Sequence, residues 1–254
     1  MEIPLYLAMT AAEFHASQAL PPNPAWMACH FSLYGTGLSN IPRTLPPGSM
    51  LMLNDRIPIC GHDPRLVAET LAEAAKALGC ESIALDFQRE SCQQLLEVIQ
   101  EILDHASCPV GVSALCAGDF DCPVLMPPIP PYTEPKAALS AWAGRELWLE
   151  LSTEGTQITV TEEGSSFTPL PAFTTDGHEE AELHCHYRIT VQEDCVLFHL
   201  GRTAEDQATL VRTAASCGAT KALGLWQEKS LLQLQQAQES SDQPKASSAS
   251  LNAP

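Results

Sequence analysis

The sequence predicts an α/β fold of the (β/α)8 TIM-like barrel type, with some helices reduced and with an antiparallel β insertion after the seventh strand. Short apolar segments recur along the chain, and several are apolar on both faces, as parallel strands covered by helices are. Segments of helical periodicity lie between them, and two of these end in glycine shortly before the next apolar segment. One further stretch alternates polar and apolar residues. An open doubly wound sheet is the alternative arrangement of the same elements.

Eight apolar segments are expected to be the strands of this barrel, which is the number that a TIM-like barrel contains. Their ranges are Ile3–Met9, Trp26–Ser32, Met50–Asn54, Ile83–Gln88, Pro109–Leu115, Val124–Pro128, Glu146–Leu151 and Ala222–Trp226. The sequence contains neither a G-x-G-x-x-G motif nor a P-loop, so it gives no indication of nucleotide binding.

Three helices have clear sequence signals at their ends. Asp63 is the expected N-cap of the first, Pro64 takes its first position and Gly79 ends it. Ser91 is expected to open the second helix, and Thr203 the third, which also has the capping-box pattern. Helices that alternate with short strands in this way are typical of a repeated strand–helix unit.

The chain departs from this alternation between the seventh strand and the last helix. The segments "TQITVTEEGSSFTPL" and "HCHYRITVQEDCVLFHL" alternate polar and apolar residues around Glu-Gly and Glu-Asp pairs, which are typical of turns. We therefore expect one barrel domain over residues 1–234 that includes an antiparallel insertion at about residues 152–200. Residues 235–254 contain almost no apolar side chains, and we expect them to be a disordered tail.

Charge and cysteine content narrow the possible partners and compartment. The 254 residues carry a formal net charge of −18, which repels nucleic acid and anionic membranes, so neither is expected as a partner. The ten cysteines form no C-x-x-C pair, and the N-terminal segment resembles no signal peptide. These features predict free, mostly buried thiols and a cytoplasmic location. No cofactor is predicted.

The stretch "GCESIALDFQRE" ends a helix, forms a short strand and then becomes polar. It resembles the fourth-strand signature of the family 18 glycoside hydrolases, the chitinase-like barrels, which reads Asp-Gly-x-Asp-x-Asp-x-Glu. Aligned residue by residue, the first Asp falls on Glu81, the Gly on Ser82, the second Asp on Ala84, the third Asp on Asp86 and the Glu on Gln88.

The resemblance implies a sugar-active barrel with an altered catalytic position. In the family, the Glu protonates the leaving oxygen while the acetamido group of the substrate attacks, steadied by the Asp. An amide such as that of Gln88 cannot donate a proton as an acid does, so the resemblance implies a carbohydrate-binding barrel whose hydrolase activity is lost or altered. Such barrels often end their eighth strand in a Trp on the pocket floor, which is the position of Trp226.

Strand alternation adds further residues to this candidate site. Asp86 and Gln88 share one face of their strand, and the active site of a barrel lies at the C-terminal strand ends. If the leucines of "ELWLEL" face the helices, Glu150 points to the barrel axis near Asp86, so this pair is the candidate catalytic pair. Expected ligand-binding residues are Gln88, Arg89, Trp226, Asp55 and Tyr34, for a small-molecule or oligosaccharide ligand. Pairing of Arg89 with a local acid is the alternative.

Two other interpretations remain open. The chain could be a metal-dependent barrel hydrolase that uses His30, Asp55, His62 and Asp86, or a non-catalytic scaffold. His184 and His186 would need further ligands to hold zinc, and no known spacing supplies them, so no metal site is predicted.

Overall fold

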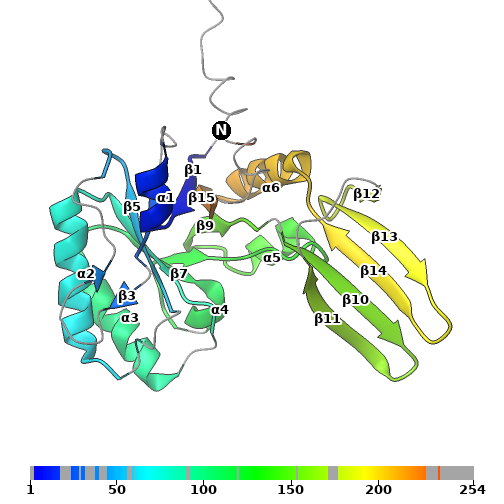
Figure 1. The fold of residues 1–254 in the computed structure, drawn as a ribbon, viewed down its shortest axis with the longest axis horizontal. Coiled ribbons are helices and arrows are strands. Elements are labelled where there is room, and N and C mark those ends of the chain that lie inside the picture. Colours follow the sequence, from blue (N-terminus) through cyan, green and yellow to red (C-terminus); the bar gives the residue numbers. More distant parts are fainter. Residues whose placement is uncertain are drawn as a thin grey trace, which may run out of the picture.

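The computed structural model describes residues 3–17, 24–28, 30–31, 38–39, 45–55, 59, 61–89, 92–118, 120–152, 154–170, 177–226 and 234. These residues form a mixed α/β fold with a parallel, barrel-like sheet and a separate antiparallel sheet. Figure 1 shows α2 and α3 packed beside the barrel on one side and the antiparallel hairpins extending away from it on the other. The expected tail at residues 235–254 lies outside the described residues.

Parallel pairing joins the strands of the barrel into a ring. The strands are β1 (Leu5–Met9), β2 (Pro24–Ala28), β5 (Met50–Asn54), β6 (Ser82–Asp86), β7 (Val110–Ser113), β8 (Val124–Met126), β9 (Glu146–Glu150) and β15 (Ala219–Leu225). They close in the order β1-β15-β9-β8-β7-β6-β5-β2. The open doubly wound alternative is therefore wrong, and the architecture is consistent with a TIM-like fold. Two short strands, β3 (His30–Phe31) and β4 (Leu38–Ser39), pair antiparallel outside this ring.

Two of the helices, α2 and α6, begin directly after the capping residues expected from the sequence. The helix bounds are α1 Ala11–Ala16, α2 Pro64–Leu78, α3 Gln93–His105, α4 Ala114–Ala117, α5 Pro135–Ser140 and α6 Ala204–Ser216. Asp63 caps α2 by accepting a hydrogen bond from the backbone of Arg65 (3.0 Å), and Gly79 ends this helix in the left-handed conformation. Thr203 and Asp206 form the capping box of α6. The N-cap of α3 is Cys92, and the expected Ser91 lies outside the described residues.

Two hydrophobic clusters occupy the two sides of the barrel wall. Alternate residues of the strands meet inside the barrel, among them Tyr6, Met52, Ala84, Trp148 and Leu223. The residues between them in sequence point outward and join the cluster shared with the helices. This alternation follows from the two-residue period of a strand, and it decides which polar side chains at the strand ends can reach the interior.

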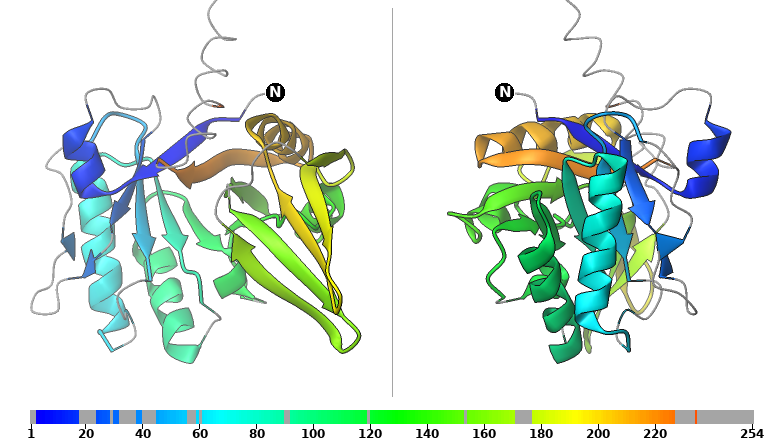
Figure 2. Two further views of the ribbon diagram at one scale, coloured as in Figure 1. Left: turned by 45° about the vertical axis from the view of Figure 1, so that its right-hand side comes forward. Right: turned by 90° about the vertical axis from the view of Figure 1, so that its left-hand side faces the viewer.

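The antiparallel sheet follows β9, the seventh barrel strand along the chain. Its strands are β10 (Gly155–Thr161), β11 (Gly164–Leu170), β12 (His178–Glu180), β13 (Cys185–Val191) and β14 (Val196–Gly201). Their order in the sheet is β11-β10-β14-β13-β12. Both hairpins extend away from the barrel in the left view of Figure 2, and α6 then leads the chain back to β15.

Candidate functional site

Asp86, Gln88 and Glu150 meet at the C-terminal ends of β6 and β9. The Gln88 Nε2 group donates hydrogen bonds to Asp86 Oδ1 and to Glu150 Oε1, the latter at 3.2 Å. Asp86 and Gln88 continue the inward-facing alternation of Ala84, and Glu150 continues that of Trp148. The structure therefore brings together the three polar residues that strand alternation placed on one rim.

Asp86 and Glu150 both line a small cavity in the mouth of the barrel. Its volume is about 40 Å³, and its other walls are apolar side chains and backbone of the barrel strands and the residue after β9. They are Ala8, Met52, Met126, Leu151, Leu223, Gly224 and Leu225. The cavity itself is too small for a sugar ring, so a ligand would have to lie above it, over the carboxylates.

A larger groove begins at the other side of Glu150. It has a volume of about 350 Å³ and lies between the loop that follows β8, the base of β10 and β11, and α6. Tyr132 and Phe167 stand at this groove with their ring centroids 5.1 Å apart, and both side chains are exposed. Aromatic rings beside carboxylate groups form a surface on which the apolar face of a sugar ring can pack.

Sequence reasoning missed Tyr132 and Phe167 as groove residues. Tyr132 follows a run of prolines in a loop, and Phe167 is one of several apolar residues in an alternating strand. Neither pattern carries a signal for a site, because the groove exists only where the insertion and the β8 loop approach each other. The prolines of "MPPIPPY" indicate a rigid loop, because each proline fixes its φ angle, but they do not indicate a binding site.

Asp55 and Arg89 lie near the C-terminal rim of the barrel, where they form an ion pair with each other. Arg89 Nε donates to Asp55 Oδ2 at 2.8 Å, and its Nη2 donates to the Asp55 carbonyl at 2.5 Å. Asp55 directly follows the inward-facing Asn54, and Arg89 directly follows Gln88, so both fall on the opposite alternation from the cavity residues. The pair ties the end of β5 to the segment after β6, which is the pairing of Arg89 with a local acid given as the alternative, and ligand contact by Asp55 and Arg89 stays a prediction.

Trp226 also lies apart from the cavity. Leu223 is the inward-facing residue of β15, so Trp226 falls on the outward alternation, where it packs partly buried against the cluster shared with the helices. It lines neither the small cavity nor the groove. The expectation of a Trp on the pocket floor is thus corrected by the register of β15. Tyr34 lies outside the described residues.

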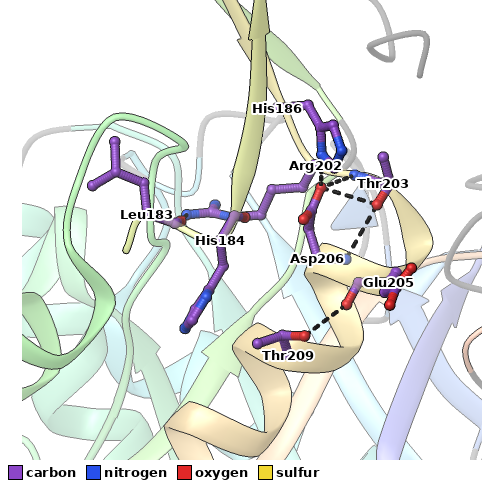
Figure 3. Close-up of polar contacts among 8 residues, drawn as sticks. All are labelled: Leu183, His184, His186, Arg202, Thr203, Glu205, Asp206 and Thr209. Atoms are coloured by element: carbon purple, nitrogen blue, oxygen red, sulfur yellow. Dashed lines mark hydrogen bonds and ion pairs between the residues drawn. The ribbon is translucent and has the colours of Figure 1, made fainter. Parts of the chain in front are cut away.

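One wall of the groove is held in place by Arg202, a buried side chain just after the end of β14 (Figure 3). Its guanidinium donates to the carbonyl oxygens of Ile129, Pro130 (3.1 Å), Leu183 (3.3 Å) and His184 (3.0 Å). Burial lowers the pKa of Arg202 to about 10. These contacts fasten the proline-rich loop after β8 to the base of the insertion, which fixes the width of the groove.

The two histidines of "HCHY" make separate contacts near Arg202. Nε2 of His184 lies 3.0 Å from Thr213 Oγ1, and Nδ1 of His186 lies 2.7 Å from Asp206 Oδ2, at the N-terminus of α6 (Figure 3). Both rings thus join the insertion to α6. Within the described residues, no group of three or more His, Cys, Asp or Glu side chains is placed to hold a metal ion. The described helices also include none of the length and apolarity needed to span a membrane.

Comparison with known proteins supports a fold like that of the family 18 glycoside hydrolases. The structure is similar to a family 18 chitinase mutant of Cycas revoluta in complex with (GlcNAc)4, with a TM-score of 0.56, 9% sequence identity and coverage of 94% of this chain and 99% of that one. It is also similar to a family 18 N-acetylglucosaminidase of Paenibacillus barengoltzii, with a TM-score of 0.55, 7% identity and coverage of 93% and 98%.

A chitinase of Chromobacterium violaceum gives a TM-score of 0.51 at 10% identity, with coverage of 93% of this chain and 99% of that one. No protein-family model matches the sequence, and no curated protein sequence does either. At these identities the likeness concerns the fold, so the chemistry of this chain has to be argued from its own residues.

Proposed function

We propose that this chain is a divergent (β/α)8 barrel of the family 18 glycoside hydrolase type that binds an oligosaccharide or a related ligand at its C-terminal rim. We further propose that its hydrolase activity is lost, or depends on an acid at another position. The observation that carries the proposal is the position of Gln88, whose amide donates hydrogen bonds to both Asp86 and Glu150.

The chemistry of an amide explains why this arrangement favours binding. Gln88 has hydrogen-bond donors but no acidic proton, so it cannot protonate a leaving oxygen. General acid catalysis is typically worth about 10²–10⁴-fold, and the loss of the acid alone would leave a slow enzyme. Asp86 and Glu150 remain suited to accept hydrogen bonds from sugar hydroxyl or amide groups, and the rings of Tyr132 and Phe167 offer a packing surface along the groove.

The test restores the acid and measures binding and hydrolysis separately. The wild type and the Gln88→Glu variant are titrated with chito-oligosaccharides by calorimetry, and release of product is followed on the same substrates. We expect the wild type to bind without appreciable turnover. We expect Gln88→Glu to hydrolyse at least about tenfold faster than the wild type, because the variant supplies a proton donor at the position that the family uses.

A matched control is Gln100→Glu, which makes the same chemical change on the exposed side of α3, where Gln100 contacts Asp104. It should alter neither binding nor turnover. Brisk turnover by the wild type that Gln88→Glu does not improve would show that Gln88 is not a lost acid. Failure of the wild type to bind any chito-oligosaccharide would argue against this class of ligand.

A further inference from the structure

The antiparallel sheet has two chemically different faces. Residues paired across neighbouring strands point to the same side, and the pairs Ile158–Phe167, Ile158–Phe198 and Ile189–Phe198 join apolar side chains of β10, β11, β13 and β14. Val160 and Val191 continue this face two residues further toward the hairpin tips, where both pair with Val196. The apolar face, as we name it, consists of Ile158, Val160, Phe167, Ile189, Val191, Val196 and Phe198.

The opposite face is mostly polar, with Leu197 between Thr159 and Thr190, and it is internally hydrogen-bonded. Gln157 Oε1 lies 3.0 Å from His199 Nε2, and the Gln157 amide donates to Thr159 Oγ1 (3.1 Å). Arg188 and Thr190 continue this polar face on β13, because they alternate with Ile189 and Val191. A sheet with one polar and one apolar face normally packs its apolar face on another layer.

The apolar face is nevertheless exposed at several positions. Val191 keeps 77% of its surface accessible, Phe167 keeps 55% and Ile189 keeps 47%. The hairpins extend beyond the barrel, so the barrel and helices do not form a second layer over their outer part (Figures 1 and 2). A contiguous exposed apolar surface of this kind marks an interaction site more often than a single exposed apolar residue does.

Acidic residues surround the outer end of the apolar face. The β10–β11 turn carries Glu162 and Glu163, and the β13–β14 turn carries Glu193 and Asp194. These four residues line one hollow, of about 690 Å³, together with Val160. All four are exposed, so the end of the apolar face has a strongly negative rim.

We propose that the apolar face is a docking surface for another protein, which binds through an amphipathic segment with apolar side chains on one side and Lys or Arg at its end. The apolar side chains would cover the outer part of the sheet, and the basic residues would lie against the four carboxylates of the hairpin tips. A second copy of this chain fits less well, because each copy has a net charge of −18 and the same acidic tips. This inference does not rest on the proposed carbohydrate function, although Phe167 belongs both to the groove and to the apolar face.

The experiment uses two synthetic probes and two variants of the full chain. The probes are a fluorescent amphipathic peptide of Leu and Lys and a peptide of the same pattern with Glu in place of Lys. The test variant is Ile189→Thr/Val191→Thr, which removes apolar surface, keeps β-branched side chains and leaves the groove residues unchanged. The control variant is Thr190→Val, on the polar face of the same strand.

Binding is measured by fluorescence anisotropy, and the urea midpoints of all variants verify folding. We expect the Leu/Lys peptide to bind the wild type and Thr190→Val alike, and Ile189→Thr/Val191→Thr at least about tenfold more weakly. We expect the Leu/Glu peptide not to bind. If the Leu/Lys peptide bound Ile189→Thr/Val191→Thr as tightly as the wild type, its binding would be due to charge attraction alone, and the proposal would be wrong.

Sedimentation of the wild type over a range of concentrations tests whether a second copy of this chain binds the apolar face. A monomer at all concentrations agrees with the proposal. A dimer that dissociates in Ile189→Thr/Val191→Thr and persists in Thr190→Val would show that a second copy covers the apolar face, and the proposal of a basic partner would then be wrong.

Discussion

Gly111 of β7 lies directly against the indole ring of Trp148 inside the barrel. A Cβ atom on residue 111 would come within 2.4 Å of Trp148 Cε3, which is closer than two carbon atoms can approach. Trp148 is fully buried, and its Nε1 group donates a hydrogen bond to Glu146 Oε1 at 2.9 Å. The large ring reaches across β8 and can fill the barrel only because β7, two strands away from β9, carries no side chain at this point.

Gly111→Ala is expected to destabilise the protein by about 3 kcal/mol, because it overpacks an interior that has no room to relax. The measurement is the free energy of unfolding in urea. Gly79→Ala is the control: Gly79 has φ 69°, but a Cβ atom on residue 79 would meet no atom within 4 Å, so only the backbone cost of about 1 kcal/mol applies. Equal losses in the two variants would mean that the ring of Trp148 moves aside freely.

The carboxylate of Glu146 makes stability depend on pH. Its partial burial raises its pKa, but hydrogen bonds from Thr220 and Trp148 and the nearby charge of Lys221 outweigh this effect, and the pKa of Glu146 is lowered. A carboxyl group with a lower pKa in the folded state stabilises the protein above its unfolded pKa of about 4.3, and this stabilisation is lost as the pH falls through the folded pKa.

Glu146→Gln should therefore be less stable than the wild type near neutral pH, and the difference between the two should shrink below about pH 4. Urea midpoints measured across this range provide the test. Glu162→Gln, on the exposed β10–β11 turn, serves as the control for removing one carboxylate. A difference in stability between Glu146→Gln and the wild type that does not shrink below about pH 4 would contradict this account.

Strand alternation predicted the part of the site that lies within regular strands. The apolar residues Ala84 and Leu147 fixed which face of β6 and β9 points inward, and Asp86 and Glu150 followed from that alternation. Asp63 and Thr203 likewise predicted helix starts, because a capping side chain acts on the backbone two or three residues away.

The prediction failed where a residue's role depends on distant parts of the chain. Asp55 and Arg89 were placed correctly at strand ends and pairing of Arg89 with a local acid was one interpretation, but the sequence did not identify Asp55 as the partner. Trp226 was misplaced because the sequence did not show which face of β15 points into the barrel: Leu223 does, so Trp226 falls on the outer face. Tyr132 and Phe167 come from a loop and from the insertion, and no local pattern predicts their meeting.

The buried cysteines are expected to be unreactive. Burial raises the pKa of Cys116 to about 12 and that of Cys122 and Cys185 to about 11, so these thiols stay protonated at neutral pH. Cys92 and Cys217 are exposed. We expect iodoacetamide to modify Cys92 and Cys217 in the folded protein and to spare the three buried thiols.

Mass spectrometry of the digested protein reads each thiol separately, and the urea-unfolded protein gives the full extent of modification for comparison. Rapid modification of Cys116, Cys122 or Cys185 without denaturant would show that the barrel and insertion open on the timescale of the reaction, which their burial does not lead us to expect.

Arg202 should be the side chain that joins the insertion to the barrel. Replacement by Met removes the guanidinium and leaves the carbonyl oxygens of Ile129, Pro130, Leu183 and His184 without this donor. We expect Arg202→Met to lose about 3 kcal/mol of stability, since the orphaned acceptors are largely buried, and Arg202→Lys to lose less, since an ammonium group reaches fewer of them.

The loss should be concentrated at the contacts that Arg202 makes. In hydrogen exchange, the segment 177–185 and the loop that follows β8 should exchange faster in Arg202→Met than in the wild type, whereas β5 and β6 should change little. Arg65→Met is the control: the Arg65–Glu69 pair on α2 is exposed, so this substitution should cost less than about 0.5 kcal/mol. If Arg202→Met behaved like Arg65→Met in both measurements, the groove wall would be held by packing alone, and the geometry beside Glu150 would not depend on Arg202.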